Sequence, residues 1–172
     1  MDTVKLLNQS HQAALSAVTG LTTDEWNRLS GCGKWSVKDL MAHLAAFEQV
    51  LVDVLTSVLD DSPTPALGRL LEGYFRFNGS ELNLRHDWTV DDVLLEYMFA
   101  HEQTVALLAQ LPDETRQQKG LLRWYGEDFD LDDFISQVFY GHKQEYIAQI
   151  MTFRYHMARE ANEESQYAGE LN

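Results

Sequence analysis

Apolar residues recur along this chain at the three- and four-residue spacing of helices, and few runs alternate apolar and polar positions as strands do. Four long segments carry such a stripe, at about residues 3–18, 36–59, 89–111 and 130–160. Each segment has one apolar face and one polar face, and four such faces can be buried together in one core. The pattern therefore predicts an all-α protein, an antiparallel four-helix bundle.

The ends of these segments carry residues that start and stop helices. Gly20 follows the first segment, where glycine commonly ends a helix. Ser36 with Asp39, and Thr89 with Asp92, have the residue types and spacing of a capping box. We therefore expect the second and third long helices to begin at Ser36 and Thr89.

Residues 63–87 separate the second and third long segments, which leaves room for a crossover along the bundle. Thr64 and Pro65 can start a further helix here, because proline is tolerated at the first helical position. We expect that helix to be short or irregular and to break at Gly79.

The chain has 172 residues, the size of one ordinary domain. Its final stretch is polar and lacks an apolar stripe. We therefore expect residues 1–160 to form the bundle and residues 161–172 to form a frayed tail.

Acidic side chains outnumber basic ones by 27 to 13, which gives a formal net charge of −14. Such a surface repels nucleic-acid phosphates and anionic lipids, so we expect no nucleic-acid partner and no membrane partner. No stretch approaches the ~20 apolar residues that span a bilayer, and the N-terminus lacks the pattern of a signal peptide. Cys32 is the only cysteine, so no internal disulfide is possible. These features predict a cytoplasmic protein.

Polar side chains inside the apolar stripes are the candidates for chemistry. At ~100° per residue, His43 falls on the flank of the second stripe and His101 near the middle of the third. His142 is central in the fourth stripe, and Tyr146 and Gln149 follow it on the same face. A buried polar group left unpaired costs ~1–3 kcal/mol, so these groups must pair with each other, water or a metal. Two imidazoles from different helices, with a third group one turn along, are typical of a metal site in a bundle.

Two of these positions lie in segments that resemble a known family. Residues 35–44, Trp-Ser-Val-Lys-Asp-Leu-Met-Ala-His-Leu, resemble the start of the second helix in the DinB/YfiT-like superfamily. Residues 142–150 look like the family's fourth-helix motif His-x-x-x-His-x-x-Gln-Ile, and residues 89–114 are similar to its third helix and closing Leu-Pro-Asp-Glu turn. The resemblance extends over most of the chain, from about residue 25 to about residue 155.

The resemblance implies a four-helix bundle that is often a homodimer. In metal-binding members, one histidine of the second helix and two of the fourth hold a divalent ion, usually nickel or zinc. Some members use a low-molecular-weight thiol in transferase or isomerase reactions, and others are hydrolases. A related branch, the ClbS/DfsB-like proteins, protects cells from a reactive genotoxin and shares the opening of the second helix.

Carried over residue by residue, the resemblance makes His43 and His142 metal ligands and puts Tyr146 where the family has its third histidine. A phenol, with a pKa of ~10, is a poorer ligand near neutral pH than an imidazole.

Three hypotheses stay open at this point. The first is a metal-dependent hydrolase or thiol transferase in which Tyr146 is a ligand or a catalytic proton donor. The second is a metal-free protein that binds an unknown small molecule through His43, Tyr146 and Gln149. The third is a structural core in which these polar groups bond only to one another.

Overall fold

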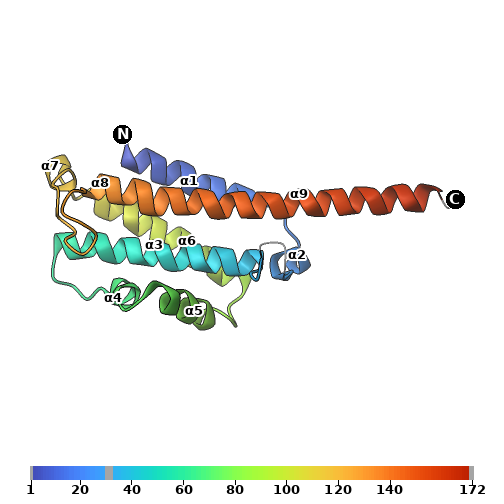
Figure 1. Cartoon of the computed structure of the whole chain (residues 1–172), viewed down its shortest axis with the longest axis horizontal. Coiled ribbons are helices and arrows are strands. Elements are labelled where there is room, and N and C mark those ends of the chain that lie inside the picture. The colour runs from blue at the N-terminus through green and yellow to red at the C-terminus, as the bar shows by residue number, and fades with distance from the viewer. Residues whose placement is uncertain (1, 30–32, 171–172) are drawn as a thin grey trace.

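The computed structural model describes residues 2–29 and 33–170, the last four of these by their backbone alone. No strand forms within those ranges, which confirms the all-α prediction. Four long helices form the bundle shown in Figure 1: α1 (Thr3–Val18), α3 (Val37–Leu59), α6 (Val90–Leu108) and α9 (Gly141–Glu170).

Two of the long helices run one way and two run the other. Figure 1 shows α1 and α9 pointing in one direction, with α3 and α6 pointing in the opposite direction. Packing in the core shows the same parallel arrangement of α3 and α6. Val37 and Val93, near the starts of these two helices, belong to one hydrophobic cluster, and Leu55 and Leu108, near their ends, belong to a second. Consecutive long helices can be parallel here because the chain between α3 and α6 returns along the bundle.

That return is the predicted crossover, which consists of α4 (Pro65–Leu71) and α5 (Tyr74–Leu84). The expected break at Gly79 was wrong, since Gly79 lies inside α5 and the two helices are separated at Glu72 and Gly73. Gly73 has a φ of 149°, a conformation that glycine adopts without the steric cost of a Cβ atom.

An acidic side chain from α3 ties the crossover to the bundle. The Asp53 carboxylate accepts hydrogen bonds from the backbone N–H groups of Ala66 and Leu67, at 2.6 and 3.0 Å. These are orphan donors of the first turn of α4, for which Thr64 provides no side-chain cap. A tertiary contact therefore replaces the local cap and fixes α4 against α3.

The capping residues that the sequence indicates behave as expected. Ser36 and Asp39 bond reciprocally at the start of α3, as do Thr89 and Asp92 at the start of α6. The remaining short helices are α2 (Thr23–Asn27), α7 (Asp113–Arg116) and α8 (Leu131–Phe134).

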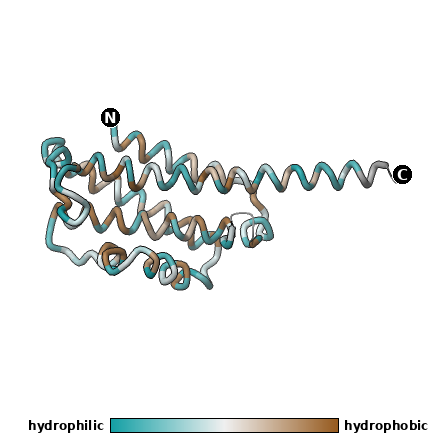
Figure 2. The backbone as a smooth tube through the Cα atoms, viewed as in Figure 1, coloured by the Kyte–Doolittle hydropathy of each residue, from teal (hydrophilic) through white to brown (hydrophobic). Residues whose placement is uncertain are grey.

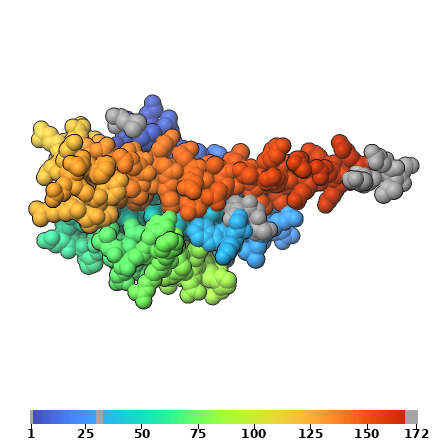
Figure 3. Space-filling view, in the orientation of Figure 1, coloured from blue at the N-terminus to red at the C-terminus, as the bar shows by residue number. Residues whose placement is uncertain are grey.

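The fourth long segment begins as predicted near Asp130, which is the N-cap of α8. A π-helix, η1 (Ile135–Tyr140), follows α8 and leads directly into α9. Helix α9 then continues to Glu170, past the expected end near residue 160, and Figures 1 and 3 show its last part projecting beyond the bundle. The division into a bundle and a frayed tail stays a prediction.

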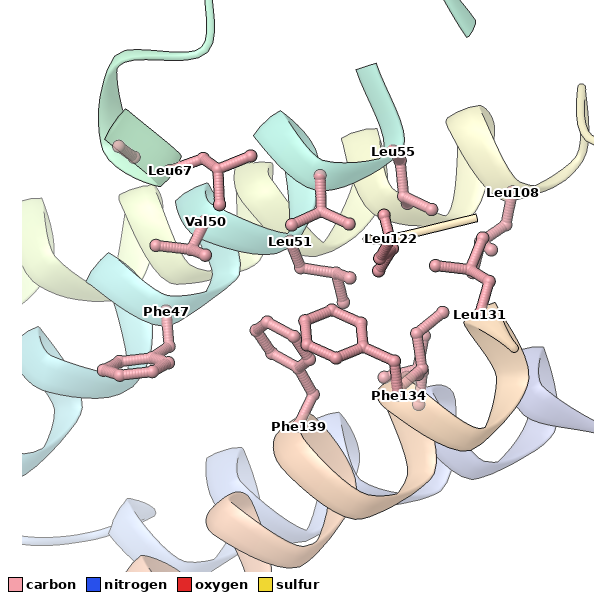
Figure 4. Close-up of a cluster of buried hydrophobic side chains, with 14 of the residues drawn as sticks. Phe47, Val50, Leu51, Leu55, Leu67, Leu108, Leu122, Leu131, Phe134 and Phe139 are labelled. Atoms are coloured by element: carbon pink, nitrogen blue, oxygen red, sulfur yellow. The ribbon is translucent and has the colours of Figure 1, made fainter. Parts of the chain in front are cut away.

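Helix α3 lies at the centre of the fold. By length and composition it could cross a membrane, but 67% of its apolar window is buried by the surrounding helices. Figure 4 shows Phe47 and Leu51 of α3 facing Phe134 and Phe139 across the core. Figure 2 shows hydrophobic residues gathered in the bundle, whereas the projecting end of α9 is largely hydrophilic.

Candidate functional site

His43 is the polar residue of the site that α3 provides. The capping box at Ser36 begins the helix about two turns earlier, and the His43 side chain has no solvent-exposed surface. Its ring lies 4.8 Å from the ring of Phe47, one turn further along the same helix. Packing against this aromatic residue limits the orientations that the imidazole can adopt.

His142 and Tyr146 lie one turn apart on α9, and both side chains are half-buried. The preceding residues, Ile135–Tyr140, form the π-helix, in which each turn is wider than in an α-helix. A wider turn changes which side of the helix the following residues occupy. The π-helix therefore helps to direct His142 and Tyr146 toward α3, and the apolar spacing of this segment gave no sign of it.

The two imidazoles meet directly. The Nε2 atoms of His43 and His142 are 3.0 Å apart, which is hydrogen-bonding distance, and the ring centroids are 4.9 Å apart. The ring of Tyr146 lies 4.8 Å from that of His43 and 4.7 Å from that of His142. The structure thus brings together His43, His142 and Tyr146, and we call the first two the histidine pair.

Both members of the histidine pair are neutral near pH 7. Burial is the main cause that lowers the pKa of His43 to about 3, and the neighbouring His142 adds to it. Burial is also the main cause that lowers the pKa of His142 to about 4, and the Lys143 ammonium adds to it. One ring can therefore donate its Nε2–H to the other, while Nδ1 of His43 has no hydrogen-bond partner among the described residues.

Aromatic rings surround the histidine pair. Trp35 lies 5.1 Å from the ring of His43 and stacks on Tyr146 at 6.1 Å. Phe47 lies 4.4 Å from the ring of His142, and Tyr74 meets Phe47 edge-on at 6.1 Å. The rings of Trp35 and Phe47, together with the phenols of Tyr74 and Tyr146, make the environment of the imidazoles largely apolar.

The phenol of Tyr146 stays protonated in this environment. Burial raises its pKa to about 12, and the neighbouring Tyr74 and Glu145 contribute to the rise. Tyr146 is therefore a hydrogen-bond donor near neutral pH, and ionising it to serve as a metal ligand carries an added cost. Sequence analysis did not identify Tyr74, because it lies in the crossover, far from both histidine segments.

The donor set fits an ion that is held by two imidazoles. Two nitrogens bound to a tetrahedral zinc at ~2.0–2.1 Å lie about 3.3 Å from each other, close to the 3.0 Å between the Nε2 atoms. A third ligand of the usual kind is lacking: within residues 2–29 and 33–170, no three His, Cys, Asp or Glu side chains form a group that could hold a metal. Any further ligand would have to be Tyr146, water or substrate.

Comparison with known proteins supports the family. The model of the DinB superfamily matches residues 6–145, which is most of the chain. The chain belongs to the DinB superfamily. His43 and His142 lie inside the matched residues, whereas Tyr146 and Gln149 lie just beyond their end. No curated protein and no solved structure matches this DinB chain.

The other residues singled out from the sequence lie in different places. Gln149 lies on α9 close to Tyr146, and its half-buried side chain is engaged in an interaction within the protein. Cys32 lies outside the described residues. His101 is buried on α6, where Nε2 bonds to the Asn8 side chain at 2.9 Å. It belongs to a different group of polar residues from the histidine pair.

That group, which we call the inner polar cluster, consists of His11 on α1, Glu48 on α3, His101 on α6 and Lys143 on α9. Glu48 and Lys143 form an ion pair with exposed side-chain fractions of 0% and 2%. The ring of His11 stacks on that of His101 at 3.8 Å, and Nδ1 of His101 lies 3.9 Å from the Glu48 carboxylate. All four long helices thus contribute one polar side chain to the middle of the DinB bundle.

Opposite charges hold the inner polar cluster together. Burial alone would raise the pKa of Glu48, but the Lys143 ammonium and His101 outweigh it, and the pKa is lowered. Burial, aided by His101 and Lys143, lowers the pKa of His11 to about 4. The cluster is therefore one buried ion pair beside a neutral, stacked histidine.

Proposed function

We propose that this DinB protein is a metal-dependent enzyme, a hydrolase or a thiol transferase, in which His43 and His142 hold a divalent ion. The observation that carries the proposal is the 3.0 Å separation of the two Nε2 atoms, contributed by helices α3 and α9. Both rings are neutral near pH 7, and neutral imidazole nitrogens suit zinc and nickel. The ligand that completes the ion is water or the substrate.

The protein side chains around the ion would divide the work. A divalent ion bound there supplies a Lewis acid that polarises an oxygen or sulfur atom of the substrate. Tyr146, which keeps its proton because of its raised pKa, is placed to donate that proton or a hydrogen bond. Gln149, further along α9, is the proposed hydrogen-bonding residue for the ligand. We further propose that the enzyme acts on a small molecule in the cytoplasm, as a homodimer.

A metal-free binding or protective protein is the second candidate. It is favoured by Tyr146, since a phenol with a pKa of about 12 is a better hydrogen-bond donor than metal ligand. His43 and His142 would then satisfy each other by their hydrogen bond and offer acid–base groups to a bound molecule. The two candidates differ in whether the histidine pair binds an ion.

Calorimetric titration of tag-free protein with Zn²⁺ and Ni²⁺ separates the candidates. The matched variants are His142→Ala and His156→Ala, because His156 is an exposed histidine further along the same helix. We expect one equivalent of ion to bind the original protein and the His156→Ala variant, and binding to be lost in His142→Ala. Binding that is equal in all three, or absent from all three, would contradict the proposal.

A further inference from the structure

The part of the chain that carries His142 is held in the bundle by a charged side chain. Phe139 in η1 and Ile150 in α9 are both buried in the hydrophobic core. Between these two positions Lys143 is the only buried residue, with 2% of its surface exposed. The one fully buried contact of this stretch is therefore made by an ammonium group and not by an apolar side chain.

Lys143 of α9 forms its ion pair with Glu48 of α3. The exposed fractions of the two side chains are 2% and 0%. Two residues of α6 lie beside the pair: the ring centroid of Tyr97 is 5.6 Å from the Lys143 ammonium, and Nδ1 of His101 is 3.9 Å from the Glu48 carboxylate. A displacement of α9 against α3 would leave a buried charge without its partner, so the ion pair restricts how the two helices can lie against each other.

The histidine pair is built on the same two helices, close to the ion pair. His142 directly precedes Lys143 on α9, and His43 is five residues before Glu48 on α3. The 3.0 Å between the Nε2 atoms of the histidines and the contact between the two charges therefore require the same placement of α9 against α3.

The π-helix makes this placement one that needs support. η1 (Ile135–Tyr140) ends shortly before His142, and its wider turns accommodate more residues than an α-helix would. Relaxation of η1 to a regular α-helix by one residue would turn the following residues by ~100° about the helix axis. That turn would carry His142 away from His43. Lys143, the first buried residue after η1, opposes it because the same turn would break the ion pair.

We propose that the Glu48–Lys143 ion pair sets the register of α9 against α3 and so holds the two imidazoles of the histidine pair at bonding distance. Glu48 and Lys143 are positioning residues, which act on binding only through the placement of His43 and His142. The proposal rests on the proposed function only where it predicts metal affinity, since the hydrogen bond between the two histidines can be measured without a metal.

That hydrogen bond is the readout, measured as the scalar coupling between the two Nε2 nitrogens in metal-free, ¹⁵N-histidine-labelled protein. The test variant is Glu48→Met with Lys143→Met, which leaves no buried charge uncompensated. The matched control is Glu96→Gln, which removes one charge from the largely buried ion pair of Glu96 with Arg85. We expect the coupling in the original protein and in Glu96→Gln, and its loss in the double variant.

Zinc affinity of the same proteins measures the consequence for binding. Loss of a group that supports metal ligands weakens a metal site about 10- to 100-fold. The double variant should therefore bind zinc at least about tenfold more weakly than the original protein. Glu96→Gln should bind zinc as the original protein does.

Coupling of the original size in a folded double variant would overturn the positioning role, and so would the absence of coupling from the original protein. Glu48→Gln keeps the shape of the side chain and removes its charge, so it serves if the double variant does not fold, and undiminished coupling there would also overturn the role. Zinc binding of equal strength in the original protein and the double variant would reject the positioning role alone. Coupling that is lost as expected, in a protein that binds no zinc, would reject the metal alone.

Discussion

The histidine pair and the inner polar cluster are two groups of polar side chains that the same two helices, α3 and α9, help to build. Glu48 and Lys143 of the cluster are charged, fully buried and bonded to each other. His43 and His142 of the pair are neutral, and His142 is only half-buried. In one group the charges compensate each other, whereas in the other two neutral imidazoles share a single hydrogen bond.

The comparison shows that burial of polar groups does not by itself mark a functional site. A buried ion pair is satisfied from within, and an added ligand would have to break it. A pair of neutral imidazoles can exchange its mutual hydrogen bond for a metal or a substrate at little cost. The inner polar cluster should therefore govern stability, and the histidine pair should govern binding.

The largest expected effect is a loss of folding stability when the ion pair of the inner polar cluster is broken. Lys143→Met leaves the Glu48 carboxylate buried without its cation, which should lower the free energy of unfolding by about 3–5 kcal/mol. Replacing both residues, as in Glu48→Met with Lys143→Met, should restore most of the loss, because two apolar side chains leave no uncompensated charge. Urea unfolding of the three proteins measures this. A loss below about 1 kcal/mol in the single variant would show that the carboxylate is hydrated or protonated instead.

The next largest expected effect is a loss of folding stability at acidic pH. The pKa of His11 is lowered from 6.5 to about 4 in the folded protein, so between these values the unfolded chain binds a proton that the folded protein does not. Stability is therefore greatest above pH 6.5 and falls as the pH drops toward 4, by up to about 3 kcal/mol for this histidine. His11→Phe keeps a stacked ring without a titrating group, and its stability should fall less steeply over that range. Parallel pH profiles for both proteins would contradict the buried, neutral state of His11.

A substitution beside the histidine pair should alter metal binding. Tyr146→His provides a third imidazole, one turn from His142, in place of a phenol whose pKa is about 12. We expect zinc or nickel affinity to rise at least about tenfold, which corresponds to about 1.4 kcal/mol. Calorimetry measures the gain, and Tyr146→Phe serves as the control that removes the hydroxyl without adding a ligand. If neither the original nor the histidine variant binds an ion, the metal-free candidate is preferred.

The smallest expected effect on stability is at the histidine pair itself. His43→Leu removes a buried imidazole whose Nδ1 has no partner, and the freed His142 side chain is half-exposed and can bond to water. The free energy of unfolding should change by less than about 1.5 kcal/mol, although metal binding should be lost. A loss as large as that of Lys143→Met would mean that the pair is structural.

The fold could be predicted from the sequence where local chemistry decides it. Ser36 with Asp39, and Thr89 with Asp92, start their helices as capping boxes because both bonding partners lie within one turn. In the crossover, residue types close in sequence did not predict where the helices break or how α4 is capped. The break falls at Gly73, and Asp53, distant in sequence, caps α4. Tertiary contacts decide both features.

The candidate site was predictable in part for the same reason. His43, His142 and Tyr146 interrupt apolar stripes and match family segments, so they could be found without coordinates. Glu48 and Tyr74 could not, since α3 is buried on nearly all sides and its polarity pattern does not indicate which neighbour each residue meets. The π-helix before His142 also leaves no signal in apolar spacing.

The most direct test of the account is the nitrogen resonances of the two imidazoles during zinc titration of ¹⁵N-histidine-labelled protein. We predict that the Nε2 signals of His43 and His142 shift together and stop shifting at one equivalent of zinc, while those of His11 and His101 stay unchanged. Unchanged signals from the histidine pair at saturating zinc, or shifts confined to the inner polar cluster, would contradict the assignment of the pair as the metal-binding centre.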